Sequence, residues 1–270
     1  MIQSLRRQAG IYGAIAAMVP KEYSAYSIWV WMQFIVQIFS MMIFVYFWRA
    51  VYTSASTLGG LDLQQTINYI LLAQILMPIV ETRLIFQFGF MVRNGGVAVE
   101  LLRPLDFQGR FFIENLAGLG VFAIEKLPLF VIAVVFFSLQ LPTDPLVWIV
   151  FLISLTMGAS ILFLFDWIFA SLAFYSTETW GLSVVRIGIA TFFSGALVPL
   201  TMLPTWLQDV AAALPFAQTI FVPVSFLSGI TPIANAPQVW LVQLAWFAGL
   251  LILSRWVFSR AIRQVTVQGG

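Results

Sequence analysis

Six long apolar runs constrain the structure of this chain more than any other feature of its sequence. Each run has about the 20 apolar residues that a helix needs to cross a hydrocarbon layer of about 30 Å, and each lies between charged residues or Gly and Pro. The runs cover residues 27–51, 67–90, 116–141, 146–174, 184–203 and 238–258. We therefore expect an all-α integral membrane protein with six transmembrane helices, which form a single domain over residues 1–270.

The amino-acid composition limits the catalytic and binding sites that this chain can supply. Only 9% of the 270 residues are charged and 61% are hydrophobic, whereas about a quarter of the residues of a soluble domain are charged. The chain has no histidine and no cysteine, which excludes disulfides, thiolate nucleophiles, histidine bases and zinc sites of the His/Cys kind. We expect no catalytic residues, no metal site and no cofactor in this chain. A net charge of +2 without a clustered basic face also gives no reason to expect nucleic-acid binding.

The basic residues predict the orientation of the chain. Nine of them lie before the first run, between the second and third, or from the end of the sixth run onward: Arg6, Arg7, Lys21, Arg93, Arg103, Arg110, Arg255, Arg260 and Arg263. The opposite loops carry only Arg49 as a cation, together with Asp62, Asp144 and Asp209. The positive-inside rule therefore predicts cytoplasmic termini. Arg186, at the start of the fifth run, falls on the cytoplasmic side or inside the membrane.

Residues 1–25 predict a helix that lies on the cytoplasmic leaflet. Apolar or small residues recur there at intervals of three and four, at Ile2, Leu5, Ala9, Tyr12, Ala16 and Val19. The apolar stretch is short and is interrupted by Gly10 and Gly13, so we do not interpret it as a signal peptide.

The segment 204–237 is apolar but contains five prolines, which a continuous helix facing lipid cannot accommodate. We expect two short helices, at 204–214 and 216–229, which form an extracellular lid or re-entrant hairpin. The candidate lid residues are Pro204, Trp206, Leu207 and Pro215.

Charged residues inside the apolar runs form a second candidate site. They are Glu81, Arg83, Glu125, Lys126 and Asp166. Such residues are costly in lipid and mark a transport pathway or a buried ion pair. Neighbours one or two positions apart do not face each other on a helix, so we predict the pairs Glu81–Lys126 and Arg83–Glu125, with Asp166 available to either cation. Two interpretations stay open: a latch between helices, or contact with a substrate. Gln33 and Gln37 are interpreted as a polar stripe for contact between helices.

The cytoplasmic connection 92–110 is longer than a simple turn requires. A glycine pair and a proline delimit a short amphipathic helix at about 97–103, which exposes Leu101 and Leu102 and suggests docking onto a partner. The candidate coupling residues are Gly95, Gly96, Val97, Glu100, Leu101, Leu102, Arg103 and Pro104, with Glu178 in a second cytoplasmic turn. No phosphate-binding Gly-Lys-Ser/Thr loop is present, so an ATP-driven protein of this kind would need another polypeptide to bind ATP.

The stretch Gly-Gly-x-x-x-x-Leu-Leu-Arg-Pro at 95–104 resembles the signature of ABC-2 type transporter permeases, particularly a poorly characterised branch of bacterial export permeases. Further matches lie at 194–200, 203–207, 214–216 and 267–270. The resemblance implies an interfacial N-terminal helix, six spans, a coupling helix between the second and third spans, and short extracellular helices before the sixth.

The resemblance also implies partners. These are two ATP-binding cassette ATPase subunits, which carry ATP and Mg, and a second permease, identical or related, in the bacterial inner membrane. The exported substrate stays unidentified. Two other functions remain open: an ion- or proton-coupled carrier that titrates Glu81, Glu125 and Asp166, and a membrane scaffold without transport.

Overall fold

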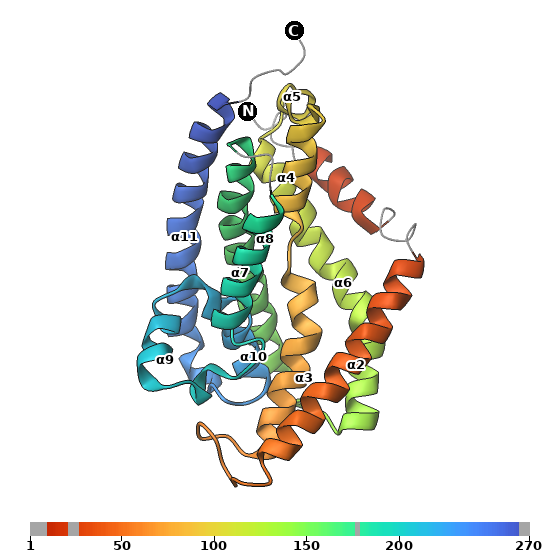
Figure 1. Ribbon diagram of the computed structural model, residues 1–270, viewed down its shortest axis with the longest axis vertical. Helices are drawn as coiled ribbons and strands as arrows, with labels where there is room; N and C mark the ends of the chain where they lie inside the picture. Colours follow the sequence, from red (N-terminus) through yellow and green to blue (C-terminus); the bar gives the residue numbers. More distant parts are fainter. Residues whose placement is uncertain (1–9, 21–26, 176–178, 265–270) are drawn as a thin grey trace.

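The computed structural model describes residues 10–20, 27–175 and 179–264, and the regular structure there is helical (Figure 1). Five helices in this part of the chain are long and apolar enough to cross a membrane, and the bent pair Thr205–Ala212 and Pro215–Leu227 brings the number of crossings to six if it is counted as one span. The prediction of an all-α membrane protein is confirmed.

The helices follow one another with short connections. A helix at Gly10–Pro20 precedes α2 (Ser27–Val51), α3 (Leu63–Val80), α4 (Leu84–Arg93), α5 (Gly96–Leu101), α6 (Phe107–Phe137), α7 (Pro145–Ser171), η1 (Leu172–Phe174), α8 (Trp180–Phe193), η2 (Leu200–Met202), α9 (Thr205–Ala212), η3 (Pro215–Gln218), α10 (Phe221–Leu227), η4 (Ile233–Asn235), α11 (Ala236–Ala261) and η5 (Ile262–Gln264). The expected N-terminal helix is seen at Gly10–Pro20, while Ile2, Leu5 and Ala9 lie outside the described residues.

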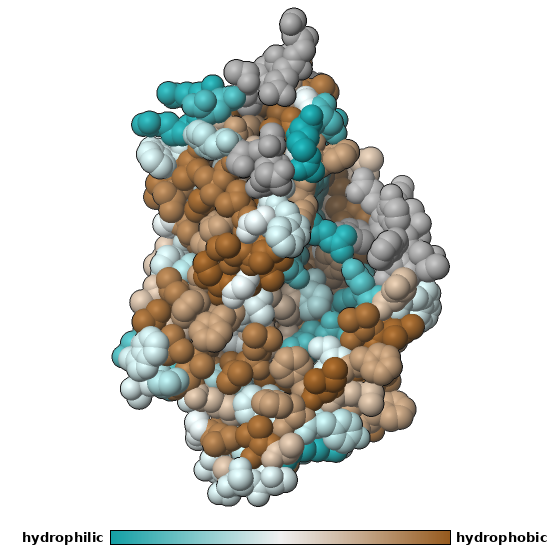
Figure 2. Space-filling view, in the orientation of Figure 1, coloured by the Kyte–Doolittle hydropathy of each residue, from teal (hydrophilic) through white to brown (hydrophobic). Residues whose placement is uncertain are grey.

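Two spans form the centre of the bundle. In the most apolar window of the α3–α4 span and of α7, 61% of residues are buried, against 17% in α2, α6 and α11. The outer helices expose large apolar side chains, including Trp31, Ile43, Val135 and Phe136, and Figure 2 shows extensive brown surface. Apolar surface on this scale is unfavourable in water and suits contact with lipid.

The second apolar run is not one helix. α3 ends at Val80, Glu81 has an extended backbone conformation, and α4 begins at Leu84. The expectation of an unbroken helix at 67–90 is wrong. Pro78 weakens the helical hydrogen bonding at the end of α3 because it has no N–H to donate to the carbonyl of Gln74. That carbonyl instead accepts a hydrogen bond from Gln37 Nε2 at 2.9 Å, so Gln37 makes the helix contact that its position on α2 predicts.

The fifth apolar run is also interrupted. α8 has 14 residues and therefore spans about 21 Å, less than the hydrocarbon thickness. The expected helix at 184–203 stops at Phe193 because the chain turns at Gly195, whose φ of 78° is in the left-handed region. A Cβ on Gly195 would lie 2.7 Å from the hydroxyl oxygen of Tyr69, so glycine is also required there for space.

The segment after this turn packs into the bundle. The buried residues of η3 and α10 contact α7, and α10 also contacts α3. The Gln218 carbonyl accepts a hydrogen bond from the buried side chain of Gln243 at 3.1 Å, and the Tyr69 hydroxyl donates to the Gly195 carbonyl at 2.8 Å. α9 lies outside, with Trp206 66% exposed. Pro215 is buried within the bundle, whereas Pro204 and Trp206 are exposed and Leu207 is partly buried.

The two ends of the bundle differ in charge. α5 and the last turns of α11 lie at one end, and α9, α10 and the loop between α2 and α3 lie towards the other (Figure 1). The first end carries arginines, at Arg93, Arg103, Arg110, Arg255 and Arg260. At the other end, Asp62 and Asp144 cap the starts of α3 and α7.

Candidate functional site

The break between α3 and α4 lies against a buried ion pair. Arg186 of α8 and Asp166 of α7 are 2% and 1% exposed, and Arg186 Nε donates to Asp166 Oδ1 at 2.5 Å. A second guanidinium nitrogen pairs with Oδ2, and the hydroxyl of Thr82 donates to the same oxygen. Glu81 Oε1 lies 3.6 Å from Arg186 Nη1. Three helical segments therefore meet at one guanidinium group.

The predicted charge pairs are wrong. Glu81 pairs with Arg186, and Lys126 Nζ lies 2.7 Å from Oε1 of its neighbour Glu125. The first pairing differs because the helix break redirects residues 81–83. The second differs because the lysine has four flexible methylene groups that bring its ammonium group to the adjacent carboxylate, although the two backbone positions do not share a helix face.

Arg186 is the functional candidate that sequence reasoning left out of the site. The sequence signal for it was an arginine within the fifth apolar run. Because Arg186 lies near the start of that run, the sequence was equally consistent with a position at the cytoplasmic end of the helix. The structure places it 2% exposed at the centre of the ion cluster. Glu125 and Lys126 form a separate pair on α6.

A cavity of about 1010 Å³ adjoins the helix break. Its walls come from the helix at Gly10–Pro20, α2, the 81–87 segment, the chain from Arg103 to Lys126, and α8. Figure 2 shows hydrophilic side chains, in teal, in a recess in the right half of the view. Its polar and charged lining residues are Gln33, Gln37, Glu81, Thr82, Arg83, Gln87, Arg103, Arg110, Glu114, Asn115, Lys126, Ser183 and Arg186. The cavity therefore combines a polar interior with a position among apolar helices.

The short helix α5 lies in the connection between α4 and α6, beside this cavity. It follows Gly95, whose φ of 73° is unfavourable for other residues. Glu100 on α5 pairs with Arg110 at the start of α6 and lies 3.1 Å from Arg103. Arg110 Nε also donates to Glu114 at 2.9 Å. Since Arg103, Arg110 and Glu114 line the cavity, α5 is joined to the cavity wall by ion pairs.

The exposed face of α5 differs from the one expected. Leu102 is 85% exposed and Val99 is 63% exposed, whereas Leu101 is partly buried and packs against the apolar cluster that contains the buried Val97. The expectation that Leu101 is exposed is therefore wrong, because the six-residue helix turns this side chain inward. The flanking residues Gly95 and Arg103 are exposed, as is Pro104, and Gly96 is partly buried. Glu178 lies outside the described residues.

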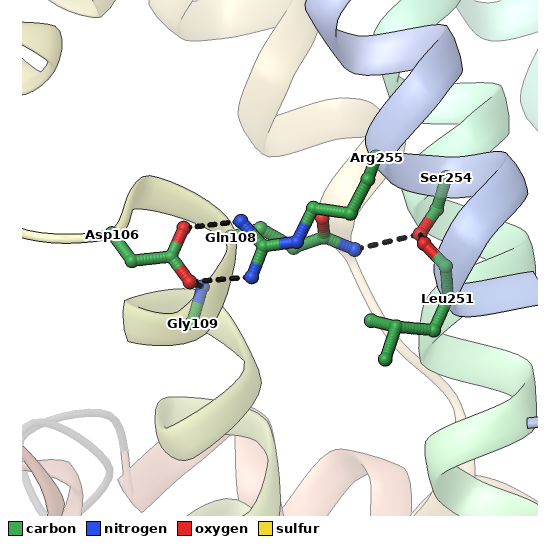
Figure 3. A network of polar contacts seen from close by, with 6 residues as sticks. All are labelled: Asp106, Gln108, Gly109, Leu251, Ser254 and Arg255. Carbon is green, nitrogen blue, oxygen red and sulfur yellow. Dashed lines mark hydrogen bonds and ion pairs between the residues drawn. The ribbon is translucent and has the colours of Figure 1, made fainter. Parts of the chain in front are cut away.

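A further set of polar contacts joins the start of α6 to the end of α11 (Figure 3). Asp106 accepts two hydrogen bonds of 2.5 Å from Arg255, and Gln108 donates to the Ser254 hydroxyl at 2.8 Å. Asp106 also caps α6 by accepting from the backbone of Gly109 at 3.1 Å. The hydrogen bonds from Arg255, together with its charge and the backbone N–H groups, lower the pKa of Asp106 below its usual value despite partial burial.

Comparison with known proteins identifies the family. The family model described as ABC-2 family transporter protein matches residues 25–269. No curated protein and no solved structure matches the chain. Because the matched range covers most of the chain and includes all of the spans, the break at 81–83 and α5, the chain belongs to the ABC-2 family of transporter proteins.

Proposed function

We propose that this chain is the permease subunit of an ATP-driven exporter in the bacterial inner membrane, with both termini in the cytoplasm. Membership of the ABC-2 family and the membrane-spanning helices support a transport permease. The arginines at the end of the bundle that carries α5 favour a cytoplasmic location for that end. The substrate would enter the cavity beside the 81–83 break and leave at the end where α9 lies.

The observation that carries this proposal is the two-sided chemistry of α5. Its outer side presents Val99 and Leu102, which have no apolar cover in the described part of the chain. Its inner side holds Glu100, which pairs with the cavity-lining Arg110. An ATPase subunit that binds the outer side would therefore displace charged groups in the cavity wall when it moves.

ATP and Mg²⁺ would be bound by that ATPase subunit, because this sequence has no phosphate-binding loop. Two ATPase subunits and a second permease, identical or related, would complete the transporter. In the most apolar windows of α2, α6 and α11, only 17% of residues are buried within the bundle. The remaining apolar surface is available to a second permease and to lipid.

The variant Leu102→Asp tests the role of α5. A carboxylate in the centre of an apolar contact leaves a charge without a partner, so we expect at least about a tenfold loss of affinity for the ATPase subunit. Co-purification with a candidate ATP-binding cassette ATPase subunit, together with ATP hydrolysis by the complex, measures the effect.

Val210→Asp provides the control, because Val210 is 41% exposed on the short helix α9, which lies towards the opposite end of the bundle from α5 (Figure 1). Unchanged co-purification and ATP hydrolysis with Leu102→Asp would remove α5 from the ATPase interface. If neither variant co-purifies with the ATPase, the substitutions impair membrane insertion and not docking. Gel filtration of each variant shows whether it is still folded and so distinguishes the two cases.

A proton-coupled carrier is the second candidate, and one observation favours it. The side chain of Glu81 is 37% exposed and lines the cavity, so this carboxylate is accessible to protons and substrate. Transport that continues after ATP depletion and stops when the proton gradient collapses would support this function. Asp166 and Glu125 are less suited to this role than Glu81, because neither lines the cavity.

A further inference from the structure

The helix at Gly10–Pro20 and α2 contribute no charged residue to the cavity lining, whereas the other segments contribute both basic and apolar residues. The helix at Gly10–Pro20 and α2 supply apolar side chains: Ile11, Ile15, Met18, Val19, Met32 and Val36. The 81–83 break, the chain after α5, α6 and α8 supply basic ones: Arg83, Arg103, Arg110, Lys126 and Arg186. A cavity lined in this way matches a molecule that has both a charged headgroup and an apolar chain.

Some of the acidic residues that pair with these basic residues line the cavity, and others lie outside its lining. Glu81 and Glu114 line the cavity, but Glu100, Glu125 and Asp166 do not, although each of these three pairs with a lining base. Lys126 and Arg186 are buried, so the accessible charges of the lining are three basic side chains, Arg83, Arg103 and Arg110, and two acidic ones, Glu81 and Glu114. A ligand inside the cavity therefore meets more guanidinium groups than carboxylates, which favours a negatively charged headgroup.

Arg83 is the basic residue best placed to bind such a headgroup. Its side chain is exposed, and no carboxylate among the described residues lies within ion-pair distance of it. It is the N-cap residue of α4 and the last residue of the break. The nearby apolar wall and the N–H donors of a planar guanidinium suit a phosphate or carboxylate on an alkyl chain.

We propose that the cavity binds the oxyanionic headgroup of a membrane amphiphile, with Arg83 as the cationic contact and the helix at Gly10–Pro20 and α2 against the alkyl chain. The inference rests on the proposed transport function, of which it names the substrate class. The volume of about 1010 Å³ is at the upper end of the range for small-molecule sites, so it accommodates a headgroup together with part of a chain.

Three probes separate the headgroup charge from the chain. Dodecyl phosphate has the anion and the chain, dodecylphosphocholine has the same chain with a zwitterionic headgroup, and inorganic phosphate has no chain. Native mass spectrometry of the full chain, purified in dodecyl maltoside, counts bound probe molecules. We expect dodecyl phosphate to bind about tenfold more tightly than dodecylphosphocholine, because charge-assisted hydrogen bonds to Arg83 favour the anion. Inorganic phosphate should bind more weakly than both.

Substitutions at Arg83 then locate the site. Arg83→Gln should weaken the binding of dodecyl phosphate about tenfold and leave dodecylphosphocholine unchanged, whereas Arg83→Lys should retain binding within about threefold. Arg49→Gln is the matched control, since Arg49 is an arginine in the last turn of α2 that does not line the cavity. Gel filtration confirms that each variant is folded.

Equal binding of the two alkyl probes, or equal effects of Arg83→Gln and Arg49→Gln, would overturn the proposal. Inorganic phosphate that binds as tightly as dodecyl phosphate would also overturn it, because the site would then take a free anion. These measurements use the permease alone. They can therefore fail while the ATPase still binds α5, and the ATPase partnership can fail while dodecyl phosphate still binds.

Discussion

The breaks at residues 81–83 and 194–195 both interrupt an apolar helical run, but charged groups surround the first and neutral groups surround the second. At the first, Thr82 and Glu81 contact the buried Asp166–Arg186 pair. At the second, the Gly195 carbonyl accepts from Tyr69, and the Ser194 carbonyl accepts from the backbone N–H of Phe221 at 2.9 Å.

This difference separates a structural break from a candidate functional one. Unpaired backbone groups are costly in a membrane, and neutral hydrogen bonds are enough to satisfy them. Burying an ion pair adds a desolvation cost that neutral hydrogen bonds avoid. The stability of the fold alone is therefore a poor explanation for the ion pair. Glu81, Thr82 and Arg186 also line the cavity, whereas Gly195 and Ser194 do not. The break at 81–83 therefore belongs to the candidate site, whereas the break at 194–195 lies outside it.

The largest expected effect comes from breaking the ion pair on one side. Arg186→Met should lower the free energy of unfolding by about 3–5 kcal/mol, because it leaves the buried Asp166 carboxylate without its cation. Equilibrium unfolding in detergent measures the loss, and Arg49→Met is the control on an exposed arginine. The double variant Asp166→Asn with Arg186→Met should be more stable than Arg186→Met alone. If the two single effects merely add, the residues do not pair in the membrane.

A smaller effect is expected where the hydrogen bonds are neutral. Gln243→Leu removes the donor to the carbonyls of Gln218 and Ser154, so it should cost about 1–3 kcal/mol in unfolding free energy. The exposed Gln238→Leu, on the same helix, is the matched control. Transport per folded molecule should be unchanged by Gln243→Leu but reduced by Arg186→Met. Loss of transport in the fully folded Gln243→Leu variant would contradict the distinction between the charged contacts at the first break and the neutral contacts of the segment that follows the second.

The smallest effect concerns the exposed Asp106–Arg255 pair. The pKa of Asp106 is lowered in the folded state, so its contribution to stability is complete above the unfolded value near 3.8 and is lost as the pH falls through the folded value. Asp106→Asn should therefore cost about 0.2–1 kcal/mol at pH 6 and less at pH 3. Asparagine still caps α6, which isolates the charge. A difference that grows towards pH 3 would contradict this sign.

The sequence determined the overall architecture because lipid imposes strong constraints on length and polarity. Runs of about 20 apolar residues must become helices in a membrane, so the helical class and most of the spans follow directly. The prolines between 204 and 237 similarly predicted short helices, of which α9 and α10 are the observed counterparts. The glycine pair predicted a short helix at about 97–103, and α5 is found at Gly96–Leu101.

Only the tertiary structure decided where the helices break and which charges meet. Composition cannot show that Gln37 of α2 satisfies the carbonyl that Pro78 leaves free, or that Tyr69 holds the turn at Gly195, because both contacts join segments far apart in sequence. Once residues 81–83 leave the helix, Glu81 faces Arg186 instead of Lys126. Helix periodicity predicts side-chain directions only within an unbroken helix, and for this reason the ion pairs required the folded chain.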